Sequence, residues 1–240
     1  MASQKVMREH FSRGVMLSVV VPTYMERESL PELVDRIEAS LKLMGFEIII
    51  VDDASPDGTA DCAEELNRDY GNIKIVKRGS KLGLSSAVLD GFQTAGTQIL
   101  AVMDADLQHP PELLSRMYTK ICEGYDLVIA SRYAEGGVIE SWSLRRRIVS
   151  KGAIFLAHML LPRTRRVKDV MSGFFMLRRN VIKEVRLNPA GFKILLEILV
   201  RGNYSSVAEI PYTFVPRKRG KSHLNLMELG NYIVHIYRLL

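Results

Sequence analysis

Short apolar runs alternate with amphipathic stretches along the first half of the chain. Five runs have the length and the β-branched composition of buried strands, at residues 16–22, 46–53, 73–78, 98–106 and 125–133. Between them, apolar residues recur at helical spacing and predict helices at 30–45, 83–96 and 110–124. This alternation is typical of an α/β domain with a mostly parallel central sheet and helices on both faces.

The alternation weakens after residue 134. The pattern there predicts a basic helix at about 141–160, strands at 172–179 and 205–215, a helix at 191–202 and an amphipathic C-terminal helix at 223–240. We expect one domain, 15–222, in which the basic half (134–222) is an appendage that completes a site opened by 15–133. Residues 1–14 are polar and are expected to form a flexible extension.

The two halves differ in charge. The 240 residues carry a net charge of +6, but residues 1–130 hold 13 basic and 20 acidic residues, whereas residues 131–240 hold 20 and 7. The basic half favours a polyanion, a phosphorylated substrate or an anionic membrane surface as its partner, and a solvated basic face is the alternative. No apolar run approaches the ~18–20 residues that cross a bilayer. Cys62 and Cys122 lack metal-type spacing and fit a reducing compartment.

The stretch VMDADLQHPP, residues 102–111, places two carboxylates at the end of a predicted strand. Because residues i and i+2 of an extended backbone face the same way, Asp104 and Asp106 can reach one ion. Oxygen ligands without His or Cys clusters suit Mg²⁺ or Mn²⁺, which commonly bridges to a phosphate. His109 is a conceivable ligand, but a structural role beside the prolines is favoured.

Other polar residues follow the first two strands, where ligands of parallel sheets bind. Asp52 and Asp53 are positioned to bond a base or a ribose, or else to cap a helix or stabilise a turn, and Asp57 is a candidate helix cap. No dinucleotide-type glycine motif, Walker loop or nucleophile elbow is present.

Arginines form a third set of candidate site residues, beside the two sets of aspartates. Arg132 ends the fifth strand, Arg145–Arg147 lie in the basic helix, and 217–221 form a basic, glycine-containing loop. Forked guanidinium groups suit phosphate, so these residues are candidates to neutralise a diphosphate and hold a second phosphate. Ordinary surface charge is the alternative for Arg145, Arg147 and Lys218. No RNA-binding or zinc-finger signature supports nucleic acid as the partner.

Several motifs together resemble the family 2 inverting glycosyltransferases. They are VVPTYMERESL, EIIIVDDASPDGT, GLSSAVLDGF, VMDADLQHPPE and SRYAEGG. Four later stretches are similar to the dolichyl-phosphate mannose synthases within that group, namely WSLRRRIVSKGA, KDVMSGFFMLRR, GFKILLEIL and PRKRGKS.

The resemblance implies a Rossmann-like glycosyltransferase-A fold and transfer of mannose from GDP-mannose to dolichyl (polyprenyl) phosphate, with Mg²⁺ or Mn²⁺ as cofactor. It implies a catalytic set of Asp104, Asp106 and Arg132, with Asp106 and Gln108 as metal ligands. The implied substrate-binding set also includes Pro22, Tyr24, Glu26, Val51, Asp53, Ala105, Arg146, Ser150, Lys193, Arg217 and His223. In this resemblance, Arg146 and Ser150 would receive the lipid phosphate together with Arg132. Arg132 would also act with Lys193 and Arg217 to hold the donor or phosphates.

The chain departs from the family pattern at His223, which stands where the family has a phosphate-binding lysine, and Lys221 is the candidate substitute. The resemblance also implies work at the cytoplasmic face of a membrane, by peripheral contact or through an anchoring subunit or a C-terminal anchor. A UDP-glucose-dependent polyprenyl-phosphate glucosyltransferase and a non-catalytic nucleotide-sugar-binding subunit are the alternatives.

Overall fold

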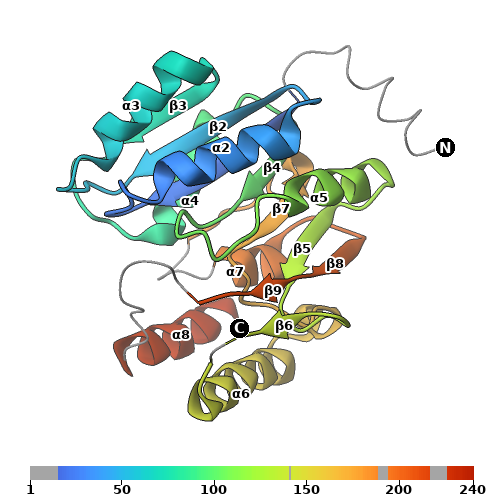
Figure 1. Ribbon diagram of the computed structural model, residues 1–240. Helices are drawn as coiled ribbons and strands as arrows, with labels where there is room; N and C mark the ends of the chain where they lie inside the picture. The colour runs from blue at the N-terminus through green and yellow to red at the C-terminus, as the bar shows by residue number, and fades with distance from the viewer. Residues whose placement is uncertain (1–15, 141, 189–193, 217–225) are drawn as a thin grey trace.

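The computed structural model describes residues 16–140, 142–188, 194–216 and 226–240 (Figure 1). The predicted extension 1–14 and three predicted site residues, Lys193, Arg217 and His223, lie outside these described residues.

A seven-stranded sheet forms the centre of the molecule, in the order β3-β2-β1-β4-β7-β5-β8 (Figure 1). Its strands are β1 (Leu17–Thr23), β2 (Phe46–Asp52), β3 (Ile73–Lys77), β4 (Ile99–Val102), β5 (Leu127–Ser131), β7 (Phe175–Arg178) and β8 (Val207–Pro211). All neighbouring pairs are parallel except those that β7 forms with β4 and β5. The predicted mostly parallel sheet is therefore confirmed. Two short strands, β6 (Val138–Ile139) and β9 (Thr213–Phe214), pair separately.

Helices cover both faces of the sheet, as predicted. They are α2 (Leu30–Leu41), α3 (Thr59–Tyr70), α4 (Leu84–Thr94), α5 (Leu113–Cys122), α6 (Leu144–Leu160), α7 (Ile194–Arg201) and α8 (Leu226–Leu239), with 3₁₀ turns η1 (Pro162–Arg166) and η2 (Arg179–Val181). Because strand side chains alternate, β1 contributes Val19 and Val21 to the core beneath α2 and α5, and Val20 to the core beneath α4. The apolar strands are thus buried on both faces.

Strand β4 ends earlier than the sequence predicts. The expected strand runs to residue 106, whereas β4 stops at Val102. Met103 N–H still donates to the carbonyl of Val20, at 3.2 Å, but Asp104 N–H donates to the His109 ring nitrogen Nδ1 at 3.0 Å. The ladder stops because a side chain takes the next backbone donor, so Asp104 and Asp106 lie in a loop rather than in an extended strand.

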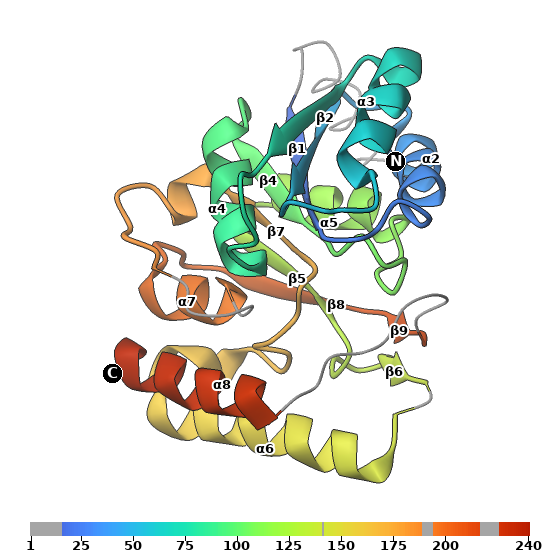
Figure 2. The same ribbon diagram turned by 90° about the vertical axis from the view of Figure 1, so that its left-hand side faces the viewer.

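The basic half is part of the same sheet and not an appendage to it. Strand β7 inserts between β4 and β5, and β8 forms the sheet edge beside β5. Helices α6 and α8 lie side by side below the sheet (Figure 2), joined by a hydrogen bond from the Tyr232 hydroxyl to the carbonyl of Ala153, at 2.7 Å. Within the described ranges, none of the helices is long and apolar enough to cross a membrane.

A buried carboxylate links strands β1, β2 and β3 at the sheet edge opposite the loop 104–108 that follows β4, here called the aspartate loop. Glu47, only 8% exposed, accepts hydrogen bonds from Ser18 Oγ and the Gly96 N–H and pairs with Lys74 Nζ at 2.7 Å. Burial alone would raise the pKa of Glu47, but the bonds from Lys74, Ser18 and Gly96 more than offset this and hold that pKa below its usual value.

Candidate active site

The predicted site residues that follow the strands lie at one edge of the sheet. Since β5 and β4 are both antiparallel to β7, the carboxyl ends of β1, β2, β4 and β5 meet there, together with the amino end of β7. Ligands of open α/β sheets bind at this edge. The antiparallel strand β7 matters because it brings residues 172–174 next to the loop that follows β4.

His109 holds the aspartate loop in shape. Its ring is 3% exposed and packs 5.3 Å from the Phe174 ring and 6.1 Å from the Tyr212 ring, centroid to centroid. Because Nδ1 accepts the Asp104 N–H, the His109 ring is fixed by a backbone contact and is not placed as a metal ligand. The structural role predicted for His109 is confirmed.

The oxygen atoms of this loop suit a hard divalent cation. Asp106 is 8% exposed, and its Oδ1 accepts the Gln108 N–H at 3.1 Å. Gln108 Nε2 donates to the carbonyl of Val215 at 2.7 Å, which leaves the amide oxygen of Gln108 as its ligand-type atom. Among the described residues, no group of three or more His, Cys, Asp or Glu side chains is arranged to hold a metal. Two carboxylates and an amide match a Mg²⁺-type site that is completed by water and phosphate.

Gly173 leaves space for the Asp104 carboxylate. A Cβ atom placed on Gly173 would lie 2.9 Å from Asp104 Oδ2, closer than real Cβ atoms approach, and 3.2 Å from His109 Cε1, which is tighter than most real contacts. The glycine of the KDVMSGF motif therefore gives the Asp104 carboxylate the space that it occupies, and a side chain at this position would have to displace that carboxylate. No sequence pattern predicts this contact.

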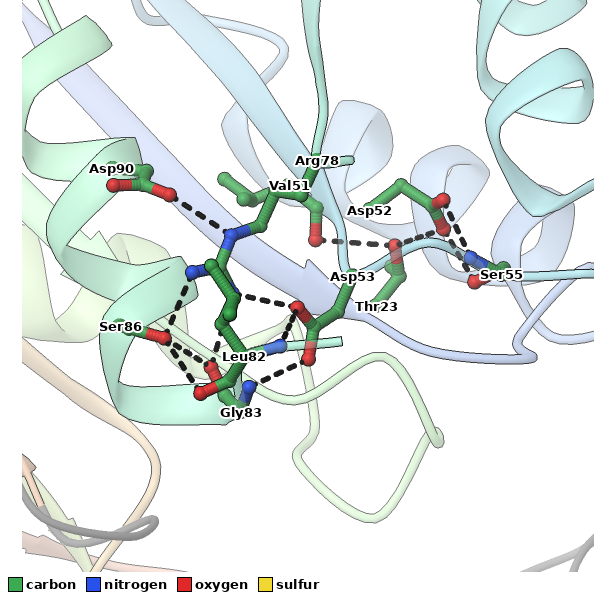
Figure 3. A network of polar contacts seen from close by, with 10 residues as sticks. All are labelled: Thr23, Val51, Asp52, Asp53, Ser55, Arg78, Leu82, Gly83, Ser86 and Asp90. Carbon is green, nitrogen blue, oxygen red and sulfur yellow. Dashed lines mark hydrogen bonds and ion pairs between the residues drawn. The ribbon is translucent and has the colours of Figure 1, made fainter. Parts of the chain in front are cut away.

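Asp53 is a loop-organising carboxylate (Figure 3). It is 4% exposed; Oδ1 accepts from Arg78 Nη1 at 2.6 Å and the Leu82 N–H at 2.9 Å, and Oδ2 accepts the Gly83 N–H at 2.8 Å. Asp52 likewise accepts from the N–H and the hydroxyl of Ser55. The sequence left two roles open for Asp52 and Asp53, binding a base or ribose and stabilising a turn or helix start. The contacts described here are those of carboxylates that stabilise turns.

Asp57 is not the N-cap of α3 that the sequence predicted, because that position is Gly58, but the Asp57 carboxylate still bonds the first residue of the helix. Its Oδ1 accepts the Thr59 N–H at 3.1 Å, at the start of α3, and its Oδ2 accepts the Arg27 N–H. Burial would raise the pKa of Asp57, and the bonds from Thr59 and Arg27 outweigh it and lower that pKa.

The remaining predicted nucleotide-side residues differ in accessibility. Tyr24 is 37% exposed, and Lys81 Nζ lies 3.4 Å from its ring centroid. Glu26 is half-buried and accepts from Ser29 Oγ at 2.6 Å. Three others are buried in the edge itself, namely Pro22, Val51 and Ala105. Tyr24 and Glu26 are thus at the surface of the edge, whereas those three form its floor.

Arg132 is clamped by Asp169. The Arg132 N–H, Nε and Nη2 donate to the Asp169 carboxylate at 3.0, 2.8 and 2.7 Å, and Asp169 is fully buried. Glu209 in turn accepts the backbone N–H groups of Lys168 and Asp169, at 2.8 and 3.1 Å. Burial would lower the pKa of Arg132, but the bonds and charge of Asp169 more than compensate and raise it.

Trp142 brings the two predicted phosphate-binding arginines together. The guanidinium carbon of Arg146 lies 4.3 Å from the Trp142 ring centroid, and that of Arg132 lies 5.4 Å from it. Ser150 Oγ is hydrogen-bonded to the Tyr133 hydroxyl at 2.8 Å, and the Tyr133 ring lies 5.8 Å from Arg132. Arg132, Arg146 and Ser150 are thus linked through two aromatic side chains.

Asp169, Trp142 and Tyr133 were not singled out from the sequence. One feature of the sequence could have pointed to Asp169, which is the only acidic residue between Glu140 and Glu184. A lone carboxylate in such a basic stretch favours an ion pair, although its partner 37 residues earlier is not readable from the pattern.

Comparison with known sequences shows the family of the chain. Residues 18–186 match the sequence profile of glycosyl transferase family 2, and the chain belongs to that family. It is 49% identical over 224 residues to a dolichol-phosphate mannosyltransferase of Pyrococcus furiosus, covering 93% of this chain and 63% of the relative. It is 38% identical over 216 residues to the polyprenol monophosphomannose synthase of Mycolicibacterium smegmatis, covering 86% of this chain and 80% of the relative.

The fold has solved counterparts. Glucosyl-3-phosphoglycerate synthase of Mycobacterium tuberculosis, in complex with Mn²⁺, UDP-glucose and phosphoglyceric acid, superposes with a TM-score of 0.73 at 19% identity, over 99% of this chain and 82% of that one. The predicted glycosyltransferase fold is therefore confirmed. The chain spans 63% of the length of its Pyrococcus relative.

Proposed function

We propose that this chain transfers mannose from GDP-mannose to dolichyl or another polyprenyl phosphate, with inversion at the anomeric carbon. The proposal is carried by the meeting of two chemically opposite groups at one sheet edge, the aspartate loop 104–108 after β4 and the Arg132–Arg146 pair after β5. A diphosphate with its cation fits the acidic side, and a phosphate monoester fits the guanidinium side. The names of the relatives support mannose and a polyprenyl acceptor.

In this proposal Asp106 and Gln108 hold Mg²⁺ or Mn²⁺, and Asp104 contacts the nucleotide-sugar. A bound cation would neutralise charge on the diphosphate as it leaves. Because Gly173 has no side chain, the Asp104 carboxylate has space at the site, and the Asp104 N–H donates a hydrogen bond to His109. Support for a divalent cation also comes from the Mn²⁺ in the Mycobacterium tuberculosis structure.

The acceptor side needs no catalytic base. A phosphate monoester has a second pKa of about 6, so it is largely dianionic and nucleophilic at neutral pH. Arg132, Arg146 and Ser150 are proposed to hold this phosphate, and Asp169 fixes the Arg132 guanidinium before the substrate arrives. Such preorganisation lowers the barrier because the charged group does not reorient during reaction.

On the donor side, the proposal uses two accessible residues of the loop after β1. Tyr24 and Glu26 are proposed to face the nucleotide directly, over the floor formed by Pro22, Val51 and Ala105. Asp53 is proposed to shape this pocket by holding the loop 78–83 through its bonds to Arg78, Leu82 and Gly83. Lys193, Arg217 and His223 remain proposed contacts for the donor phosphates.

The surface formed by α6 and α8 is proposed to contact the lipid bilayer that holds the acceptor, at its cytoplasmic face. Apolar side chains more than half exposed gather there: Leu144, Ile148, Phe155 and Met159 on α6, with Ile233, Tyr237 and Leu240 on or after α8. The α6 residues recur on one helical face, and exposed Arg145, Arg147 and Lys151 flank them. Each basic residue near anionic lipid contributes about 1 kcal/mol, which suits peripheral binding. A firmer anchor on a partner subunit or a C-terminal segment is part of the proposal.

The activity test offers GDP-mannose, UDP-glucose or UDP-GlcNAc with a polyprenyl phosphate, and Mg²⁺, Mn²⁺ or EDTA. We expect lipid-linked mannose from GDP-mannose only, and none in EDTA. Asp106→Ala should fold normally by circular dichroism yet lose turnover, whereas Asp61→Ala, an exposed carboxylate on α3, should behave as wild type. Product from UDP-glucose would make the chain a glucosyltransferase, and donor binding without product would make it a binding subunit.

The membrane test is co-sedimentation with anionic and neutral vesicles at low and high salt. Binding to anionic vesicles at low salt, weakened by Ile148→Ser and Phe155→Ser, is expected for the α6–α8 surface. Leu43→Ser is the matched control, because Leu43 is exposed at the end of α2. Binding that is absent at low salt, or equal in all variants, contradicts the membrane-facing role of this surface.

A further inference from the structure

Tyr212 carries a buried hydroxyl without a partner. The residue lies between β8 and β9 and is only 5% exposed. Among the described residues, no donor or acceptor reaches its hydroxyl oxygen. A buried polar group left without a hydrogen bond costs roughly 1–3 kcal/mol, and most such groups in proteins are satisfied. A phenylalanine would fill the same space without that cost.

The position of the Tyr212 ring is fixed from several sides. Its backbone N–H donates to the carbonyl of Ser131, at the end of β5, and its carbonyl accepts from the Val138 N–H. The ring packs edge-on against His109 at 6.1 Å and against Phe214 at 6.3 Å, between centroids. Tyr212 therefore sits between the strand end that carries Arg132 and the residue that holds the aspartate loop.

The charges that act on the phenol belong to both sides of the site. Burial raises the pKa of the Tyr212 hydroxyl; Arg132 opposes this, and the carboxylates of Asp169, Asp104 and Asp106 reinforce it. The hydroxyl consequently keeps its proton at neutral pH and is a neutral donor. A neutral donor can bond an anionic oxygen between carboxylates and guanidinium groups without adding to either charge.

We infer that Tyr212 is a further substrate-positioning residue, whose hydroxyl donates a hydrogen bond to a phosphate oxygen lying between the aspartate loop and Arg132. This inference rests on the proposed function. Two substrates could supply the oxygen, the acceptor monophosphate or the donor diphosphate, and the chemistry of the contact is the same for both.

The test is Tyr212→Phe, which removes the hydroxyl alone. Steady-state kinetics with GDP-mannose and a short-chain polyprenyl phosphate should give kcat/KM values roughly 10- to 100-fold below wild type, as expected for a bond to a charged group. The thermal midpoint should stay unchanged or rise, because no hydrogen bond of the free protein is lost. A KM effect confined to polyprenyl phosphate identifies the acceptor as the source, and one confined to GDP-mannose identifies the donor.

Tyr118→Phe is the matched control. Tyr118 is 3% exposed on α5, remote from the sheet edge, and its hydroxyl contacts sulfur atoms, Met16 Sδ at 3.6 Å and the thiol of Cys122. Loss of this hydroxyl should leave both kcat/KM values unchanged. If Tyr212→Phe keeps both values within about threefold of wild type, or if it loses activity and stability together, the inference is overturned.

Failure of the proposed function gives a different result. A wild-type protein inactive with GDP-mannose and polyprenyl phosphate leaves no kinetic comparison, so binding of GDP with Mn²⁺ and of inorganic phosphate is measured by calorimetry. Tyr212→Phe should weaken one of these affinities by roughly tenfold or more. Equal affinities for both ligands in the two proteins overturn the role of Tyr212.

Discussion

Replacing Asp169 with asparagine tests the Arg132 clamp. The asparagine side chain is nearly isosteric with aspartate, but one of its two polar atoms is an NH₂ group, which would face an N–H of the guanidinium where an oxygen now accepts. The change removes the partner of a charge whose side chain is 11% exposed, beside a carboxylate that is fully buried. Breaking a buried ion pair from one side costs about 3–5 kcal/mol. For a chain of 240 residues this is a fall in thermal midpoint of roughly 6–20 °C.

The same bidentate geometry occurs on the surface and gives a control. Arg36 Nε and Nη2 donate to the Glu112 carboxylate, each at 2.9 Å, but the two side chains are 31% and 58% exposed. Exposed pairs contribute about 0–1 kcal/mol, so Glu112→Gln should lower the midpoint by no more than roughly 4 °C. Urea denaturation of wild type, Asp169→Asn and Glu112→Gln measures both costs under one set of conditions.

Activity provides a second readout for Asp169→Asn. The Arg132 guanidinium loses its fixed orientation, so the KM for polyprenyl phosphate should rise by more than the KM for GDP-mannose, at a temperature where the variant is fully folded. Equal stability losses in Asp169→Asn and Glu112→Gln would refute the reasoning that burial gives the clamp its importance.

Three further predictions follow from single contacts. Because the pKa of Glu47 is lowered in the folded state, its stabilisation is present above about pH 4.5 and is lost as the pH falls further. Glu47→Gln should therefore flatten the decline in unfolding free energy that the wild type shows as the pH falls below about 4.5, and an unchanged decline contradicts this. Gly173→Ala should displace the Asp104 carboxylate and lower turnover roughly 100-fold, whereas Gly79→Ala, where a Cβ meets no atom within 4 Å, should keep wild-type rates. Asp53→Asn breaks the buried ion pair with Arg78, so it should lower the free energy of unfolding by about 3–5 kcal/mol and also weaken nucleotide binding. A loss of binding without a loss of stability would show that Asp53 contacts the nucleotide directly.

The sequence determined the elements and the edge where the chemistry lies. Apolar period and turn residues predict the five strands and three of the four helices of the first half, because these patterns depend on neighbours along the chain. No bounds are predicted for α3, and β4 ends four residues before the predicted strand does. Since parallel strands share one carboxyl edge, the position of Asp104, Asp106 and Arg132 at strand ends was enough to group them. The sequence motifs also indicated the glycosyltransferase family, and the match to the family profile confirms it.

Tertiary structure decided how those residues are held. The insertion of antiparallel β7 between β4 and β5 pairs segments that are distant in sequence. The apolar pattern of β7 shows that the strand is buried, but it does not show which strands lie beside it. That insertion places Gly173 against Asp104 and Asp169 against Arg132. The sequence likewise does not show that the Tyr212 hydroxyl is buried without a hydrogen-bond partner, because this depends on the residues packed around it. Periodicity records whether a side chain is buried, but a hydrogen bond needs a specific partner at about 3 Å, and the packing of non-local elements supplies it.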